Sequence, residues 1–236
     1  MKQRIWELDA FRGFCVLGMI VVHFIYDLTA LYRIVKWEAP ALFSFVQNWG
    51  GVLFLLLSGV CATLGSRSFR RGLIVYGCGL LCTAVTAGMV VLGFANESII
   101  VRFGVLHCLG MCMILWSLLR RLPTWTLALL GSLMVITGLL ICDTVVEVTW
   151  LYPLGLTAAN FFSSDYFPLL PYLGFFLLGS ILGRTLYRNR QSLLPGMDQK
   201  SSVLRFLCFC GRQSLLIYLL HQPVLTAVCE VITLLK

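Results

Sequence analysis

Seven long apolar stretches constrain this chain more than any other feature of its sequence. They lie at roughly residues 10–31, 41–64, 72–94, 99–119, 124–142, 167–186 and 213–235. Each is long enough to cross a hydrocarbon core about 30 Å thick as a helix. The sequence therefore predicts an all-α, polytopic integral membrane protein with about seven transmembrane helices, in which residues 1–236 form a single transmembrane domain.

Composition supports membrane insertion and excludes several other classes of protein. The 236 residues are 59% hydrophobic and 12% charged, with a mean hydropathy of +0.92, which exceeds what a soluble domain carries. The net charge of +8 does not indicate a nucleic-acid partner, because the basic residues fall in short clusters between the apolar runs. Most of the ten cysteines lie inside those runs and none forms a CxxC pair, so we expect neither a metal site nor a disulfide framework.

The distribution of lysine and arginine predicts which way the chain is inserted. An odd number of spans with the N-terminus in the cytoplasm puts fourteen of the eighteen Lys and Arg residues inside and the other four outside. Such a bias is typical of cytoplasmic loops, so we expect a cytoplasmic N-terminus and an external C-terminus. The inner connection from Arg184 to Arg212 reads as a cytoplasmic loop, apart from a short amphipathic piece at Val203 to Cys210.

The first apolar run carries Arg12, His23 and Asp27 on one face. His23 lies eleven positions after Arg12, which on a helix brings them within about 20° of each other and about 16 Å apart in depth. Asp27 lies four residues beyond His23, near enough to accept a hydrogen bond from the imidazole. A histidine oriented by a carboxylate is a general-base arrangement. The alternative is a buried histidine satisfied by a backbone carbonyl, but ionisable groups are costly inside a membrane, which favours function.

The other two histidines also fall inside apolar runs, at a depth that suggests one polar cavity. Tyr218, His221 and Gln222 precede Pro223, whose missing amide hydrogen predicts a kinked, polar spot that either lines a cavity or is satisfied by a neighbouring helix. His107 shares its run with Arg102. The outer connection from Asp143 to Tyr166 is rich in aromatic residues and is interpreted as an interfacial or re-entrant segment over the site; it includes Asp165 and Tyr166.

Arginines at the predicted cytoplasmic helix ends are candidates for binding phosphate. Arg67, Arg70 and Arg71 precede the third apolar run, and Arg12 lies at the base of the first. Guanidinium groups bind phosphate through paired hydrogen bonds. Alternatively, such residues contact lipid headgroups.

Several motifs together resemble a known family: LDAFRGFCVLGMIVVHFIYDL, FLLLSG, RRGLIVYGCGL, RFGVLHCLG, DYFPLLPYLGFFLLG and GRQSLLIYLLHQPVL. They look like the bacterial members of the heparan-alpha-glucosaminide N-acetyltransferase catalytic-domain family, and the resemblance covers essentially the whole chain. The first run is also similar to the wider transmembrane acyltransferase superfamily, whose signature is an arginine, ten residues and a histidine, here Arg12 and His23. Lysosomal members carry asparagine at the position of His23 and a catalytic histidine in the following outer loop, whereas the matching loop here, Tyr32 to Pro40, has none.

The resemblance implies an acetyltransferase in the bacterial cell (inner) membrane. It implies that acetyl-CoA binds from the cytoplasm near Arg12, Arg67, Arg70 and Arg71, and that His23, oriented by Asp27, acts as base or acyl carrier. The recipient would be an extracytoplasmic, sugar-like amine or hydroxyl, with neither metal nor nucleic acid involved; a homodimer is left open. The candidate cavity or acceptor-binding residues are Arg102, His107, Asp165, Tyr166, Tyr218, His221 and Gln222.

Two other functions compete with acyl transfer. Paired histidines on facing helices could ligate haem in a membrane cytochrome. A proton-coupled transporter could use the same histidines as a proton relay.

Overall fold

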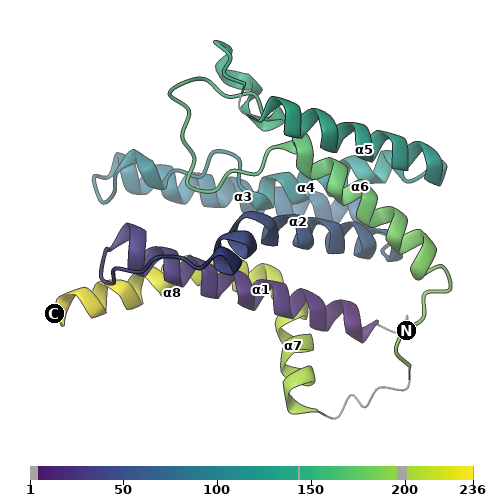
Figure 1. Ribbon diagram of the computed structural model, residues 1–236, viewed down its shortest axis with the longest axis horizontal. Helices are drawn as coiled ribbons and strands as arrows, with labels where there is room; N and C mark the ends of the chain where they lie inside the picture. Colours follow the sequence, from purple (N-terminus) through teal and green to yellow (C-terminus); the bar gives the residue numbers. More distant parts are fainter. Residues whose placement is uncertain (1–4, 143, 196–200, 236) are drawn as a thin grey trace. The chain divides into compact units, whose positions relative to one another are not determined.

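The computed structural model describes residues 5–142, 144–195 and 201–235, and within these ranges its regular elements are all helices. Two isolated β-bridges are the only extended pairings there. The prediction of an all-α fold is therefore confirmed. In chain order the elements are α1 (Trp6–Tyr26), η1 (Asp27–Leu31), α2 (Ala41–Leu64), α3 (Ser68–Val91), η2 (Glu97–Ile99), α4 (Val105–Leu119), α5 (Thr124–Ile141), η3 (Thr149–Leu154), α6 (Leu169–Leu186), α7 (Ser202–Arg212) and α8 (Ser214–Leu234) (Figure 1).

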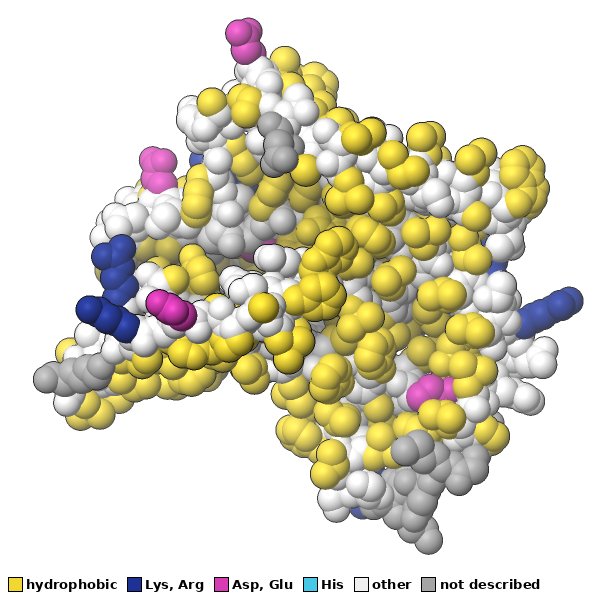
Figure 2. Space-filling view, in the orientation of Figure 1, with side chains coloured by type: hydrophobic (Ala, Val, Ile, Leu, Met, Phe, Trp, Pro, Cys, Tyr) yellow, Lys and Arg dark blue, Asp and Glu magenta, His cyan; other side chains and the backbone are white. Residues whose placement is uncertain are grey.

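Six helices of the described chain are long and apolar enough to cross a membrane. They are α1 with its extension η1, α2, α3, α5, α6 and α8. Hydrophobic side chains cover most of the face seen in Figure 2, as expected for helices that are surrounded by lipid. The chain is thus a multi-pass membrane protein, and the sequence-based count of seven spans is approximate.

The predicted and observed numbers of spanning helices differ at the fourth apolar run. Residues 99–119 were predicted to form one span, but α4 begins only at Val105, and its 15 residues rise about 22 Å, less than the core thickness. The preceding residues are extended, and Phe103 forms a parallel bridge with Tyr166. Non-helical backbone at membrane depth needs protein partners for its polar groups, and the loop before α6 supplies them.

The chain divides into two compact units. The first consists of residues 1–54 and 190–236, and the second of residues 55–189, so α2 begins in one unit and ends in the other. The prediction that residues 1–236 act as a single transmembrane domain stays a prediction. Each unit is described separately below.

In the first unit, α1 and α7 cross at a close contact between glycines. A Cβ atom on Gly13 would collide with the carbonyl of Leu207, and one on Gly211 would collide with the carbonyl of Asp9. Small residues let helix backbones approach in this way. The predicted amphipathic piece is the helix α7, whose 11 residues rise about 16 Å and cannot cross a bilayer.

Helix α1 ends in a π-helical turn that begins at Asp27. The amide of Tyr32 donates to the carbonyl of Asp27, five residues back, at 2.8 Å. Such π-turns inside helices are frequent at functional sites. Here the turn lies beside α8 in the same unit.

The second unit pairs α3 with α4 and α5 with α6, again across glycines. Gly110 of α4 faces the backbone of Tyr76, and Gly131 of α5 faces the carbonyl of Gly174 on α6. The outer connection is ordered by η3 and a bridge between Val145 and Thr157, which fits the predicted interfacial segment; Asp143 itself lies outside the described residues.

Two glycines of α1 provide a matched test of the crossing with α7. Gly13→Ala should lower the melting temperature, because the added Cβ forces the helices apart at a cost of about 1–3 kcal/mol. Gly18→Ala places the same methyl group in open space on the same helix, so stability should stay the same or rise by up to about 1 kcal/mol. The measurement is thermal unfolding of the detergent-purified protein. Equal effects of the two substitutions would contradict the crossing.

Candidate active site

Two of the three histidines lie against each other in the first unit. His23 of α1 and His221 of α8 have ring centroids 5.0 Å apart, with ring planes inclined at 82°. His221 is buried, whereas His23 is partly exposed. Sequence analysis suggested one polar cavity for the three histidines; the structure brings these two together, on α1 and α8.

Backbone carbonyls fix the proton on one nitrogen of each ring. Nδ1 of His23 donates to the carbonyl of Met19 at 2.9 Å, and Nδ1 of His221 donates to the carbonyl of Tyr218. Because a carbonyl only accepts, each Nδ1 carries hydrogen, and in a neutral ring Nε2 is left with a lone pair. Nε2 of His221 is buried without a hydrogen-bond partner in the described part of the chain. Both rings can therefore accept a proton at Nε2.

The carboxylate of Asp27 takes a partner different from the predicted one. We expected the His23 imidazole to donate to it, but the imidazole bonds to Met19 and Asp27 instead accepts from Nε2 of Gln222 at 3.0 Å. Helical side chains lean toward the N-terminus, so the ring of His23 reaches the preceding turn more readily than the following one. Asp27 is 1% exposed, and its amide partner compensates part of the cost of burying it.

The hydrogen bond to Asp27 fixes the side chain of Gln222 in the site. Its Nε2 points to Asp27, while its Oε1 is buried and has no hydrogen-bond partner among the described residues. Tyr218, also predicted here, lies with its ring centroid 5.2 Å from that of His221. The predicted group of Tyr218, His221 and Gln222 thus faces α1, and two of its acceptor atoms lack donors.

The outer end of the site is closed by a contact that sequence analysis did not identify. The hydroxyl of Tyr32 donates to Oε1 of Glu230 at 3.0 Å, joining the end of η1 to α8. Burial and this carboxylate raise the pKa of Tyr32 to about 12, so the hydroxyl stays protonated and donates at physiological pH.

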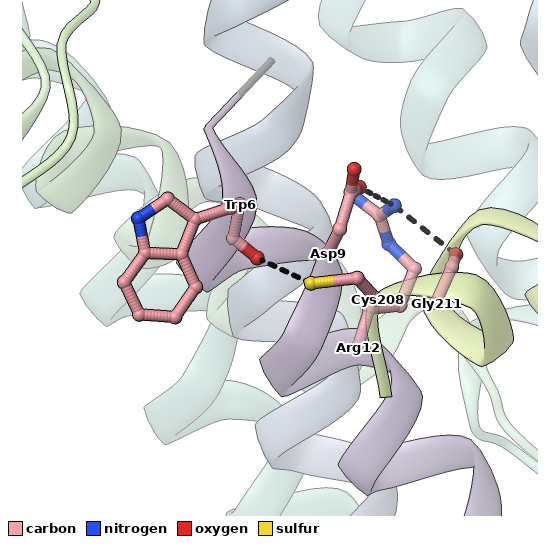
Figure 3. A network of polar contacts seen from close by, with 5 residues as sticks. All are labelled: Trp6, Asp9, Arg12, Cys208 and Gly211. Atoms are coloured by element: carbon pink, nitrogen blue, oxygen red, sulfur yellow. Dashed lines mark hydrogen bonds and ion pairs between the residues drawn. The ribbon is translucent and has the colours of Figure 1, made fainter. Parts of the chain in front are cut away.

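The predicted phosphate-binding arginines lie in both units. Nη1 of Arg12 forms an ion pair with Asp9 at 3.1 Å and donates to the carbonyl of Gly211 at 3.4 Å, which ties α1 to the end of α7 (Figure 3). Arg67, Arg70 and Arg71 belong to the second unit, where they lie exposed at the start of α3. Arg12 would have to share its guanidinium between these internal partners and a phosphate.

His107 belongs to the second unit and is satisfied there. Its Nδ1 accepts from the amide of Gly104 at 3.2 Å, and its Nε2 lies 3.3 Å from the hydroxyl of Thr83. That hydroxyl donates in turn to the carbonyl of Val101 at 2.7 Å. The hydrogen therefore sits on Nε2, the opposite arrangement to His23 and His221. These internal bonds favour a structural role over the predicted acceptor-binding role.

Arg102, Asp165 and Tyr166 hold the outer loop to α4. Oδ2 of Asp165 accepts from the amide of Val105 at 3.0 Å, so its carboxylate caps the first turn of α4. Nε of Arg102 donates to the carbonyl of Phe162 at 3.0 Å, and Tyr166 donates to the carbonyl of Tyr152 at 2.7 Å. Burial raises the pKa of Tyr166 to about 12. All three were predicted to line a cavity; in the structure each forms a hydrogen bond with α4 or with the loop itself.

Comparison with known families decides which class of protein this is. The family model described as heparan-alpha-glucosaminide N-acetyltransferase, catalytic, matches residues 4–223, which is 220 of the 236 residues (223 − 4 + 1). The chain belongs to this family. It is therefore a member of a family of transmembrane acetyltransferases. Searches of curated proteins and of solved structures returned no match.

Sequence analysis missed several contacts of this family member because they are formed by backbone atoms or by isolated polar side chains, which form no recognisable motif. The carbonyls of Met19 and Tyr218 are backbone atoms, which no side-chain pattern reports. Thr83 and Glu230 are single polar residues in apolar helices. Their polarity inside a membrane helix was the sequence signal that could have pointed to these contacts.

The geometry does not fit the haem alternative. The rings of His23 and His221 meet edge to face at 5.0 Å, a contact distance that leaves no room for a macrocycle between them. Within the described residues, no group of three or more His, Cys, Asp or Glu side chains is arranged to hold a metal ion. The site instead presents nitrogen lone pairs to its surroundings.

Replacing Asp165 tests the cap on α4. Asp165→Ala should destabilise the protein by about 1 kcal/mol, because the amide of Val105 loses its acceptor at the start of a buried helix. Asp165→Asn should retain part of the stability, since an amide oxygen can still accept. Glu147→Ala removes an exposed carboxylate from the same outer connection and serves as the control. Thermal unfolding in detergent measures the effect, and a loss no larger than that of Glu147→Ala would refute the cap.

Proposed function

We propose that this protein passes an acetyl group from cytoplasmic acetyl-CoA to an extracytoplasmic, sugar-like amine or hydroxyl, with His23 as the base. Family membership supports an acetyltransferase, and the position of His23 partway along a spanning helix supports transfer within the membrane. The observation that carries the proposal is the hydrogen bond from Nδ1 of His23 to Met19, which leaves Nε2 free to accept a proton.

In this reaction the attacking group forms a bond to the acetyl carbonyl carbon while the bond from that carbon to sulfur breaks. The amine or hydroxyl loses a proton to Nε2 of His23, and the proton then goes to the departing thiolate of CoA. The products are an amide or ester and free CoA. A histidine poised in this way contributes about 10²–10⁴-fold to the rate of such a step. Direct transfer to the acceptor is the simplest route, because His23 need only exchange a proton.

The neighbours of His23 support an acceptor that carries hydrogen-bond donors. Nε2 of His221 and Oε1 of Gln222 are buried acceptor atoms without a partner among the residues that the structure describes, and leaving such atoms unpaired costs about 1–3 kcal/mol each. An amine or hydroxyl would supply the missing hydrogens. Asp27 accepts from the amide of Gln222 and so holds the Gln222 side chain in place.

The donor side of the proposal depends on the basic helix ends. Under the predicted orientation, Arg12, Arg67, Arg70 and Arg71 lie toward the cytoplasm, where the phosphates of acetyl-CoA would arrive. Guanidinium groups suit those phosphates, and the three arginines of α3 are exposed to receive them. We place the protein in the bacterial inner membrane, with a cell-envelope sugar or a similar small molecule as acceptor.

Replacing His23 tests the proposal. His23→Ala should lower kcat by about 10²–10⁴-fold and leave acetyl-CoA binding unchanged, because the imidazole acts on the acceptor proton. Met19→Leu is the matched control: it lies one turn away and contributes only its backbone carbonyl to His23, so activity should persist. The assay follows release of free CoA thiol and transfer of labelled acetyl to a panel of amino sugars and sugar alcohols in proteoliposomes.

Three outcomes would contradict this function. Wild-type protein that fails to bind acetyl-CoA would remove the donor. Turnover that survives His23→Ala would remove the base. Proton-driven movement of a substrate without consumption of acetyl-CoA would favour the proton-coupled transporter.

A further inference from the structure

A cleft of about 570 Å³ lies between the start of α1 and α7 in the first unit. Its wall is formed by Trp6 of α1 and, from α7, by Ser202, Arg205, Phe206, Phe209 and Arg212. The acetyl-transfer site described above uses none of these side chains. The cleft combines aromatic surface with two cationic groups, which is the chemistry of a site for an amphipathic anion.

Helix α7 presents an exposed apolar stripe beside this cleft. Val203, Phe206 and Phe209 recur every three residues and are 69%, 56% and 52% exposed. A neighbouring side of the helix packs on α1, where the carbonyl of Leu207 meets Gly13 and Gly211 meets the carbonyl of Asp9. Short amphipathic helices that directly precede a spanning helix, as α7 precedes α8, commonly lie in the membrane interface with their apolar face among the acyl chains.

The two cationic side chains of the cleft have no acidic partner among the described residues. Neither the guanidinium of Arg205 nor that of Arg212 forms a hydrogen bond or ion pair with those residues, whereas the carboxylate of Asp9 is paired with Arg12. The arginines are seven residues apart, so they lie on the same side of α7, two turns from each other. Burial raises the pKa of Cys208, so its thiol adds no negative charge to the wall.

Trp6 contributes an aromatic side chain to the α1 side of the cleft. The indole Nε1 of Trp6 is buried and has no partner among the described residues, although the Trp6 carbonyl accepts from Sγ of Cys208 at 3.5 Å (Figure 3). Trp is characteristic of the membrane interface, where an apolar ring and a polar N–H meet headgroups.

We propose that this cleft binds the phosphate of an anionic phospholipid from the cytoplasmic leaflet, with Arg205 and Arg212 on the phosphate and Phe206 and Phe209 against the acyl chains. A lipid satisfies both the cations and the exposed stripe at once. The nucleotide part of a coenzyme carries the same phosphate chemistry, but it would leave Val203 and the two phenylalanines uncovered. The proposal does not depend on the acetyltransferase function.

Native mass spectrometry of the full chain in detergent, titrated with phosphatidylglycerol, phosphatidylcholine or CoA, tests this site. Wild-type protein should retain phosphatidylglycerol in preference to phosphatidylcholine. The double variant Arg205→Gln/Arg212→Gln should weaken phosphatidylglycerol binding about tenfold and leave CoA binding unchanged, because each arginine at the surface of an anionic membrane contributes a favourable charge interaction. Arg205→Lys/Arg212→Lys should restore most of the binding and shows that the double variant acts through charge rather than through folding.

The control removes equal charge elsewhere on the predicted cytoplasmic side. Arg120→Gln/Arg121→Gln lies in the exposed connection between α4 and α5 and should bind phosphatidylglycerol as wild type does. Equal retention of the two lipids by wild type, or unchanged binding in Arg205→Gln/Arg212→Gln, would overturn the proposal. Loss of CoA binding with retained phosphatidylglycerol would also overturn it and would assign the cleft to a nucleotide.

Discussion

The structure depends on one constraint: a bilayer core offers no hydrogen-bond partners, so each polar group placed there must be satisfied by the protein or by a ligand. In the first unit this constraint joins α1 to α8, because Asp27 needs a donor and Gln222 provides one. In the second unit it joins the outer loop to α4, because the first-turn amide of Val105 has no acceptor within its own helix and takes the carboxylate of Asp165.

Under the same constraint, the three histidines have different hydrogen-bond environments. His107 has a partner at each ring nitrogen, so its environment is complete without a ligand. His23 and His221 each use Nδ1 on a backbone carbonyl of their own helix, and Nε2 of His221 is left buried and unpartnered. Three residues of one type in similar apolar helices therefore have different hydrogen-bond partners, which are set by the neighbouring carbonyls, amides and hydroxyls.

Much of this arrangement follows from the sequence, because hydrophobic length and polar exceptions are local properties. The apolar runs predicted the spanning helices, with α2 found at its predicted bounds, and the rarity of ionisable residues within them identified His23, Asp27 and His221. The late start of α4 was not predictable, since residues 100–104 belong to an apolar run but are non-helical, with Phe103 in a bridge to Tyr166. The expected bond from His23 to Asp27 was wrong because competition from a backbone carbonyl cannot be read from side-chain spacing.

The central claim is that His23 and His221 are held with hydrogen on Nδ1 and a lone pair on Nε2, whereas His107 has the reverse arrangement. The chain contains only these three histidines, so ¹⁵N NMR of ring-labelled protein in lipid, assigned with His107→Gln, reports each tautomer separately. The account predicts two rings with hydrogen on Nδ1 and one with hydrogen on Nε2 at neutral pH. A spectrum in which His23 or His221 carries its hydrogen on Nε2 alone would contradict the site as described and, with it, the proposed base.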